Sequence, residues 1–315
     1  MLTPTAQEFV HPALLYHDGD EYLGATVPFV RDGLAAGEPV AVAVPTANLA
    51  LLRNALGVDA EQVVFRDMTV AGRNPGAIIS AVLLAFADAH AGRRVRIIGE
   101  PIWAGRGGAE YPACAQHEAL INAAFADRPA TILCPYDMAM LDPVWVSDAH
   151  RTHPVMVTAA RRWDSPDYAD PLAVAAEFNQ PLPDPPPGAA TVTIDVFTVR
   201  AARRFAVEQA DRDGLDAQRT LDLALAVNEL AANAVRHGGG CGRLSIWVEG
   251  DQLVCQVQDS GFLTNPLAGR IPPPLGASGG RGLMMVNRLC DLVRVHTTAT
   301  GTTTRIYMHL SRERA

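Results

Sequence analysis

Ten residues in the second half of the chain carry the strongest chemical pattern in the sequence. They run Asn228-Glu-Leu-Ala-Ala-Asn-Ala-Val-Arg-His237. In a helix, Glu229, Asn233 and His237 recur every four residues and therefore share one face. A glutamate there can take a proton from a nucleophile, and an asparagine oxygen can ligate Mg²⁺. Taken alone, the same spacing also describes an ordinary solvated helix face.

Three further motifs follow in order along the chain. Asp259-Ser-Gly261 ends an alternating segment, and a carboxylate there can accept a hydrogen bond from an adenine amine. Gly279-Gly-Arg-Gly-Leu283 precedes a predicted helix, where free N–H groups and the Arg281 guanidinium suit phosphate oxygens. Gly301-Thr-Thr-Thr304 opens the last predicted strand. Each motif by itself also fits an ordinary turn, a flexible loop or a strand.

The elements that hold these motifs predict an α+β two-layer sandwich. Alternating residues indicate strands, which are followed or separated by clustered helices. The predicted strands are 191–196, 243–249, 252–258, 292–297 and 303–310. The predicted helices are 200–212, 216–237 and 282–290. The long helix buries one apolar stripe, formed by Leu223, Val227, Leu230 and Ala234.

In this order and spacing, the four motifs resemble the GHKL (Bergerat-fold) ATPases, and among them the anti-sigma-factor serine kinases, over about residues 190–310. The resemblance implies ATP and Mg²⁺ as cofactors, with Glu229 as general base, Asn233 as Mg²⁺ ligand and Asp259 as the adenine-reading carboxylate. Residues 262–278 match the place of the ATP lid. The implied nucleotide site comprises Asn228, Glu229, Asn233, His237, Asp259, Gly261, Gly280, Arg281, Gly282, Leu283 and Thr302.

The first half predicts a different fold. Short apolar runs at 40–44, 62–65, 95–98 and 131–134 alternate with helical stretches at 21–36, 46–56, 75–90 and 110–126. Such a pattern is typical of an α/β domain, in which helices cover both faces of a parallel sheet. Ligand sites in these folds lie at the carboxyl ends of the strands. The polar motifs Gly99-Glu-Pro-Ile-Trp103 and Cys134-Pro-Tyr-Asp137 follow two of the predicted strands.

This half resembles the MEDS sensory domain over about residues 10–160. The residues that carry the resemblance are His11, Tyr16, Gly99 to Trp103, His117, Glu118, Asn122, Cys134 to Asp137 and Thr152 to Pro154. The resemblance implies a RecA-like α/β sheet that senses small organic molecules. The candidate sensory residues are Glu100, Trp103, His117, Glu118, Cys134, Tyr136, Asp137 and His153.

Two other ligand classes are disfavoured for this half. Pro45-Thr-Ala-Asn48 stands after the first predicted strand, where a P-loop would need glycines and a lysine. His117, Cys134, Asp137 and His153 have suitable types for metal ligands, but no two have a short metal-site spacing. We therefore expect them to be buried, hydrogen-bonded polar residues.

Composition excludes several classes of protein. All 26 basic residues are arginine, so there is no P-loop, Schiff-base or kinase lysine. The net charge of −8 and the absence of a basic run disfavour direct nucleic-acid binding. The five cysteines form no CxxC pair, which favours reduced thiols in the cytoplasm. The sequence shows neither a signal peptide nor an apolar stretch long enough to span a membrane, so no membrane association is expected.

These observations predict a two-domain regulator. We expect a sensory domain at 1–165, a proline-rich linker at 166–189 and an ATPase domain at 190–315. The resemblance implies a serine kinase, with a sigma factor and an anti-sigma-factor antagonist as partners. The alternative is a non-catalytic ATP-binding switch that grips or releases a signalling partner. A homodimer is left open.

Overall fold

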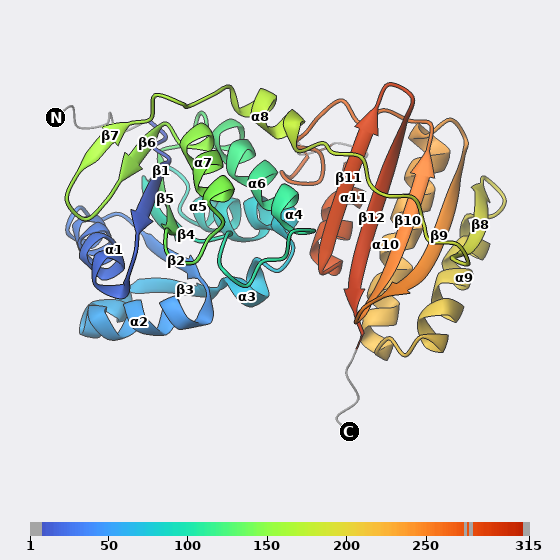
Figure 1. The fold of residues 1–315 in the computed structure, drawn as a ribbon, viewed down its shortest axis with the longest axis horizontal. Coiled ribbons are helices and arrows are strands. Elements are labelled where there is room, and N and C mark those ends of the chain that lie inside the picture. Colours follow the sequence, from blue (N-terminus) through green and yellow to red (C-terminus); the bar gives the residue numbers. More distant parts are fainter. Residues whose placement is uncertain (1–7, 274–275, 277–279, 311–315) are drawn as a thin grey trace. The chain divides into compact units, whose positions relative to one another are not determined.

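The computed structural model describes residues 8–273, 276 and 280–310. The chain divides into two compact units, Met1–Phe178 (unit 1) and Asn179–Ala315 (unit 2) (Figure 1). The predicted lid residues 274–275 and 277–278, and Gly279 of the glycine motif, lie outside the described residues. No helix in the described part of the chain is long and apolar enough to cross a membrane.

Unit 1 is built on a mixed sheet that is almost entirely parallel. Its described strands run in the order β3-β2-β4-β5-β1-β6-β7, and all neighbours are parallel except β6 and β7. The strands are β1 Pro12–Tyr16, β2 Val40–Val44, β3 Val63–Asp67, β4 Val95–Gly99, β5 Ala130–Asp137, β6 Val155–Val157 and β7 Arg162–Asp164. The α/β prediction is therefore confirmed.

Helices cover both faces of this sheet. Their bounds are α1 Gly19–Ala35, α2 Thr46–Leu56, α3 Met68–Ala71, α4 Pro75–Ile78, α5 Ala85–Ala89, α6 Tyr111–Ala124, α7 Pro143–Thr152 and α8 Pro171–Glu177. A 3₁₀ segment spans Gly57–Gln62, and a π-helical segment, Ile79–Leu84, joins α4 to α5. Every residue of β2 is buried, because alternate side chains pack on opposite helical layers.

Unit 2 is an antiparallel sheet with helices packed on one face, as predicted. The described strands run in the order β11-β12-β10-β9-β8. They are β8 Ala190–Asp195, β9 Cys241–Glu249, β10 Gln252–Asp259, β11 Leu292–Thr298 and β12 Gly301–His309. The helices are α9 Val199–Arg212, α10 Ala217–His237 and α11 Gly282–Leu289. Their apolar faces and the facing strand residues form one core.

Helix α10 is defined by local sequence signals at both ends. The Asp216 carboxylate accepts hydrogen bonds from the backbone of Gln218 and Arg219, which caps the first turn. Arg236 and His237 lie in the last turn, where positive charge complements the helix dipole. The four predicted stripe residues are all buried in the core. The opposite face of the helix is therefore free to carry polar groups.

The range 166–189, predicted as a linker, holds more structure than its prolines indicate. Helix α8 packs on α6 within unit 1 through the buried Val174 and Ala175. The side chain of Asn179 exchanges two hydrogen bonds with the backbone of Thr297 on β11. The carbonyl oxygen of Pro183 accepts a hydrogen bond from Arg305 on β12. Proline removes backbone donors but not acceptors, so this segment can pack through its carbonyl groups.

Candidate functional site

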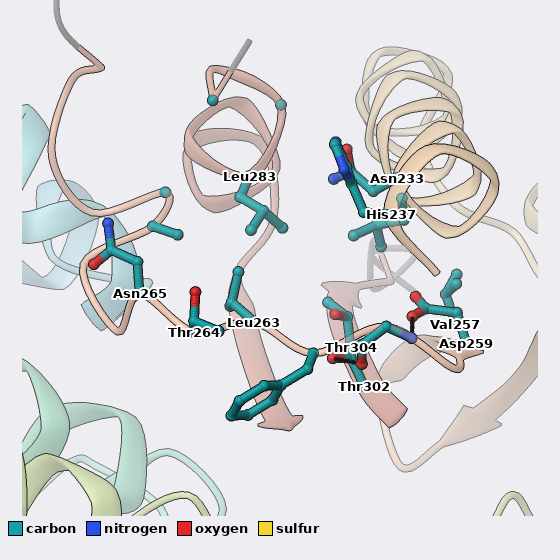
Figure 2. A pocket seen from close by; sticks show the side chains of 17 residues that line it. Asn233, His237, Val257, Asp259, Leu263, Thr264, Asn265, Leu283, Thr302 and Thr304 are labelled. Atoms are coloured by element: carbon teal, nitrogen blue, oxygen red, sulfur yellow. Dashed lines mark hydrogen bonds between the residues drawn. The ribbon is translucent and has the colours of Figure 1, made fainter. Parts of the chain in front are cut away.

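A cavity of about 350 Å³ opens in unit 2 between α10, α11 and the sheet (Figure 2). Its volume lies within the range of small-molecule pockets, about 300–1,000 Å³. The residues that line it are Leu230, Asn233, His237, Val257, Asp259, Gly261, Phe262, Leu263, Thr264, Asn265, Ala268, Gly269, Gly280, Gly282, Leu283, Thr302 and Thr304. All four motifs of the second half therefore reach the same cavity.

The polar face of α10 lies directly against the start of α11. A Cβ atom added at Gly282 would lie 2.7 Å from Glu229 Oε2 and 3.7 Å from Asn233 Nδ2. A side chain at this position would require the Glu229 carboxylate to move. The first N–H groups of an α-helix lack intrahelical partners, and here they begin beside a carboxylate and an amide. The glycine motif and the α10 motif thus form one end of the cavity.

The Asp259 turn forms the other end. Asp259 Oδ1 accepts a hydrogen bond of 2.8 Å from the backbone N–H of Gly261, and the Thr302 hydroxyl donates to the Gly261 carbonyl at 2.8 Å. A Cβ atom at Gly261 would lie 2.4 Å from the carbonyl oxygen of His237, so the turn requires glycine. Burial raises the pKa of Asp259, although the Gly261 N–H and His237 oppose the shift.

Three predicted nucleotide residues do not line the cavity itself. They are Asn228, Glu229 and Arg281, whereas the other eight line it. The carboxylate of Glu229 lies beside Gly282, and the Asn228 amide is 3.4 Å from Glu229 Oε1. Arg281 is exposed. The Thr302 hydroxyl donates to the Gly261 carbonyl and lies 2.7 Å from the Thr297 hydroxyl.

Sequence reasoning missed two threonines at this site. Thr304 lines the cavity because it lies two residues after Thr302 and therefore on the same face of β12. Because residues two apart share one face of a strand, the sequence alone could have placed Thr304 beside Thr302. Thr297 sits on β11, opposite Thr302, and its hydroxyl accepts from the N–H of Leu263 at 2.9 Å. Its role depends on strand register, which no local motif indicated.

The candidate sensory residues of unit 1 separate into two groups. The first lies at the carboxyl edge of the sheet, where Asn48 Nδ2 donates to both Glu100 oxygens at 3.0 and 2.9 Å. Burial, with a contribution from Asp137, raises the pKa of Glu100 to about 8. Burial and the nearby Glu100 also raise the pKa of Tyr16. This group therefore holds a carboxyl group that changes its charge near neutral pH.

The second group lies away from that edge. Strand β5 runs on to Asp137, so Cys134 and Tyr136 lie inside the strand and not after it, contrary to expectation. The donor atoms of His11, Glu118, Cys134 and His153 lie within 4.8 Å of one another. Of the four residues considered above for a metal site, Cys134 and His153 belong to this group, whereas His117 and Asp137 do not.

Three candidate residues, His117, Tyr136 and Trp103, are members of neither group. His117 and Tyr136 are both buried, and the Tyr136 ring meets the His153 ring edge-on at 5.5 Å. The Trp103 ring instead stacks with the guanidinium of Arg106, at 3.8 Å from the ring centroid.

We predict that Glu100→Gln reduces the loss of stability that the wild type shows as the pH rises. Between the ordinary pKa of 4.5 and the folded value of about 8, the folded protein binds more protons than the unfolded chain. The free energy of unfolding therefore falls with rising pH, by at most about 1.4 kcal/mol per unit from this group. Urea unfolding between pH 5 and pH 8 measures the slope. The exposed Glu61→Gln is the control, and an unchanged slope in Glu100→Gln would contradict the assignment.

Comparison with known proteins agrees with these two units. The family MEDS (MEthanogen/methylotroph, DcmR Sensory domain) matches residues 10–154. The family described as histidine kinase-like ATPase domain matches residues 192–308. No curated protein matches the chain.

Two solved structures are similar to parts of the chain. The RsbU and RsbW domains of Rv1364c from Mycobacterium tuberculosis are 24% identical with a TM-score of 0.31, over 41% of this chain and 34% of that one. The chain thus spans about a third of that protein's length. Acinetobacter baumannii histidine kinase AdeS is 12% identical with a TM-score of 0.24, over 64% of this chain and 96% of that one. Residues 10–154 therefore match a MEDS domain, and residues 192–308 match a histidine kinase-like ATPase domain.

Proposed function

We propose that the ATPase domain is an ATP- and Mg²⁺-dependent serine kinase of the anti-sigma-factor type, under the control of the MEDS domain. Its substrate would be a serine of an anti-sigma-factor antagonist, and its second partner a sigma factor. The MEDS domain would respond to a small organic molecule or to a partner. One observation carries the proposal: motifs from α10, the β10 turn, α11 and β12 converge on one cavity.

The Asp259 end of the cavity suits adenine. Because Oδ1 of Asp259 already accepts from Gly261, its second oxygen is available to accept from the exocyclic amine of the base. The Gly261 backbone and the Thr302 hydroxyl fix the turn that holds this carboxylate. Val257 and Leu230 add apolar surface for the ring.

The α11 end suits the phosphates. Gly280 and Gly282 line the cavity at the start of the helix, where N–H groups and the helix dipole favour anions. The side-chain amide of Asn233 lies beside Gly282, and its oxygen is a ligand type that Mg²⁺ accepts. These residues fit a nucleotide–Mg²⁺ pair, in which the ion would neutralise phosphate charge.

The carboxylate of Glu229 lies at this phosphate end, outside the cavity lining. In the proposed reaction, the serine oxygen attacks the γ-phosphorus of ATP as its proton passes to Glu229. The bond from the γ-phosphorus to the bridging oxygen breaks, and ADP leaves with that oxygen. The products are phosphoserine, ADP and a proton.

The experiment that tests the proposal uses the full chain. Purified protein is incubated with γ-labelled ATP, Mg²⁺ and each candidate antagonist encoded in the same genome. Transfer of the label to a serine supports the kinase. If no antagonist is labelled but nucleotide changes partner affinity, the protein is the non-catalytic switch.

We also predict that the full chain needs a divalent ion to bind ATP. Asn233 lies beside a phosphate end without lysine, so much of the phosphate charge would be neutralised by the ion. Calorimetry should show an affinity for ATP at least about tenfold weaker in EDTA than in Mg²⁺, a cost of about 1.4 kcal/mol or more. Asn233→Ala should lose this difference. Equal affinity of the wild type under both conditions would contradict the prediction.

A further inference from the structure

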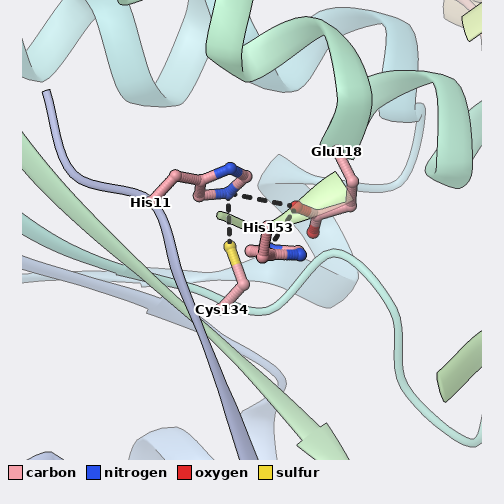
Figure 3. A group of neighbouring side chains, drawn as sticks. All are labelled: His11, Glu118, Cys134 and His153. Atoms are coloured by element: carbon pink, nitrogen blue, oxygen red, sulfur yellow. Dashed lines mark hydrogen bonds and ion pairs between the residues drawn. The ribbon is translucent and has the colours of Figure 1, made fainter. Parts of the chain in front are cut away.

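Four buried side chains from distant segments of unit 1 meet at one point (Figure 3). His11 precedes β1, Glu118 lies on α6, Cys134 lies within β5, and His153 follows α7. Their side chains are 0–1% exposed. They comprise two imidazoles, a carboxylate and a thiol, all of which are ligands of transition metals.

Three of the distances between their donor atoms match the edges of a tetrahedral metal site. His11 Nε2 lies 3.3 Å from Cys134 Sγ and 3.3 Å from Glu118 Oε2, and His153 Nε2 lies 3.2 Å from the same oxygen. Metal–ligand bonds of 2.0–2.3 Å place neighbouring tetrahedral ligands about 3.3–3.7 Å apart. All four donors lie within 4.8 Å of one another, which is close enough for them to share one ion.

Hydrogen bonds outside the group turn both imidazoles toward its centre. His153 Nδ1 lies 2.9 Å from the Ala149 carbonyl, which can only accept, so Nδ1 carries the proton. His11 Nδ1 lies 3.1 Å from Asn122 Oδ1, whose amide nitrogen donates to the Thr152 carbonyl. Each Nε2 thus directs a lone pair at the Glu118 carboxylate. Backbone and side-chain oxygens that hold Nδ1–H in this way are typical of metal-binding histidines.

Glu118 needs a cation at this position. Neither of its oxygens makes a hydrogen bond of good geometry with a described residue, and both are fully buried. His11 Nε2 and His153 Nε2 lie 3.3 and 3.2 Å from Oε2, but neutral imidazoles do not balance the charge of a buried carboxylate, which is strongly unfavourable. A divalent ion held by one carboxylate and one thiolate gives a neutral site, which suits a fully buried position.

We propose that His11, Glu118, Cys134 and His153 form a closed tetrahedral site for Zn²⁺. Mg²⁺ and Ca²⁺ prefer oxygen ligands, whereas two nitrogens, one sulfur and one oxygen suit zinc. Four protein ligands leave no open position, so the site is structural. It ties the approach to β1 to α6, β5 and the end of α7. This inference does not depend on the proposed kinase function.

The test begins with the full-length wild type. Elemental mass spectrometry of protein purified without chelator should give about one zinc per chain. Co²⁺ added to metal-depleted protein should give the near-ultraviolet thiolate charge-transfer band and the intense visible bands of four-coordinate cobalt. Chelation should lower the Tm. A wild type with no bound zinc, no thiolate band on Co²⁺ addition and a Tm unchanged by chelator would overturn the proposal without any variant.

Two cysteine variants identify the ligand. Cys134→Ser should lose the thiolate band and bind zinc more than about 100-fold more weakly, because even the loss of an outer hydrogen bond costs about 10- to 100-fold. Cys114→Ser is the matched control, since Cys114 is a buried cysteine on α6 outside the group. It should retain both the band and the zinc. If Cys134→Ser does not fold, Glu118→Gln should keep the thiolate band but weaken binding. A band that persists in folded Cys134→Ser, or an affinity unchanged in Glu118→Gln, would overturn the assignment.

Discussion

Glu229→Gln should bind ATP nearly as tightly as the wild type yet phosphorylate the antagonist about 10²- to 10⁴-fold more slowly, the usual contribution of a general base. The carboxylate lies beside Gly282, at the end of the cavity proposed to hold the phosphates, and outside the residues that line the cavity. Glutamine keeps the size of the side chain and cannot take the serine proton. Calorimetry measures the first quantity, and initial rates of label transfer measure the second.

A matched control separates this effect from a general change in charge. Glu208 lies on α9, is exposed and contacts Arg204 at 3.8 Å. The Glu208→Gln variant should therefore transfer phosphate at the wild-type rate. An unchanged transfer rate in Glu229→Gln would remove Glu229 as the base. If even the wild type transfers no phosphate while nucleotide still alters partner binding, Glu229 has no catalytic role and the switch is the function.

Asp259→Asn should weaken ATP binding by about 10- to 150-fold, which corresponds to the loss of a hydrogen bond to a charged group, about 1.5–3 kcal/mol. The structure determines how the amide would lie. The Gly261 N–H already donates to Oδ1, so the asparagine oxygen would keep that bond. The amide nitrogen would then face the adenine amine, donor against donor. Calorimetry with ATP and Mg²⁺ measures the loss.

Ser260→Ala is the neighbouring control. Ser260 is exposed, and its backbone N–H donates to the Gly238 carbonyl, which alanine preserves. Its affinity for ATP should equal that of the wild type. Equal affinities of Asp259→Asn and Ser260→Ala for ATP would show that the adenine does not bind at Asp259, although the cavity could still hold the phosphates.

Much of unit 2 could be predicted because its signals are local. The row Glu229, Asn233 and His237 follows from helical periodicity, and Asp216 marks the start of that helix. The strands of this unit alternate visibly, since one face packs on the helical core. Two threonines at the site, Thr297 and Thr304, were not predicted. The position of Thr297 at the site depends on the pairing of β11 with β12.

In unit 1, the sequence predicted the secondary structure less completely at β1 and toward the carboxyl-terminal end of the unit. Strand β1 lies between β5 and β6, yet its partners come more than a hundred residues later in the chain. The predicted strand 131–134 stops before Pro135, whereas β5 continues through it to Asp137. Helices α7 and α8 were not predicted, and each has a proline in its first turn. A proline there is compatible with a helix because its missing N–H would have had no partner.

The sequence by itself determined which residues could do chemistry and on which face of a helix or strand each one lies, because those properties repeat over a few residues. It also marked the two halves as different folds, since periodicity differs between buried parallel and half-buried antiparallel strands. Only the tertiary structure decided that His11, Glu118, Cys134 and His153 meet, whereas Trp103 lies apart from them. That convergence depends on parallel strand order and register, which are set by packing between segments far apart in the chain and leave no short-range pattern.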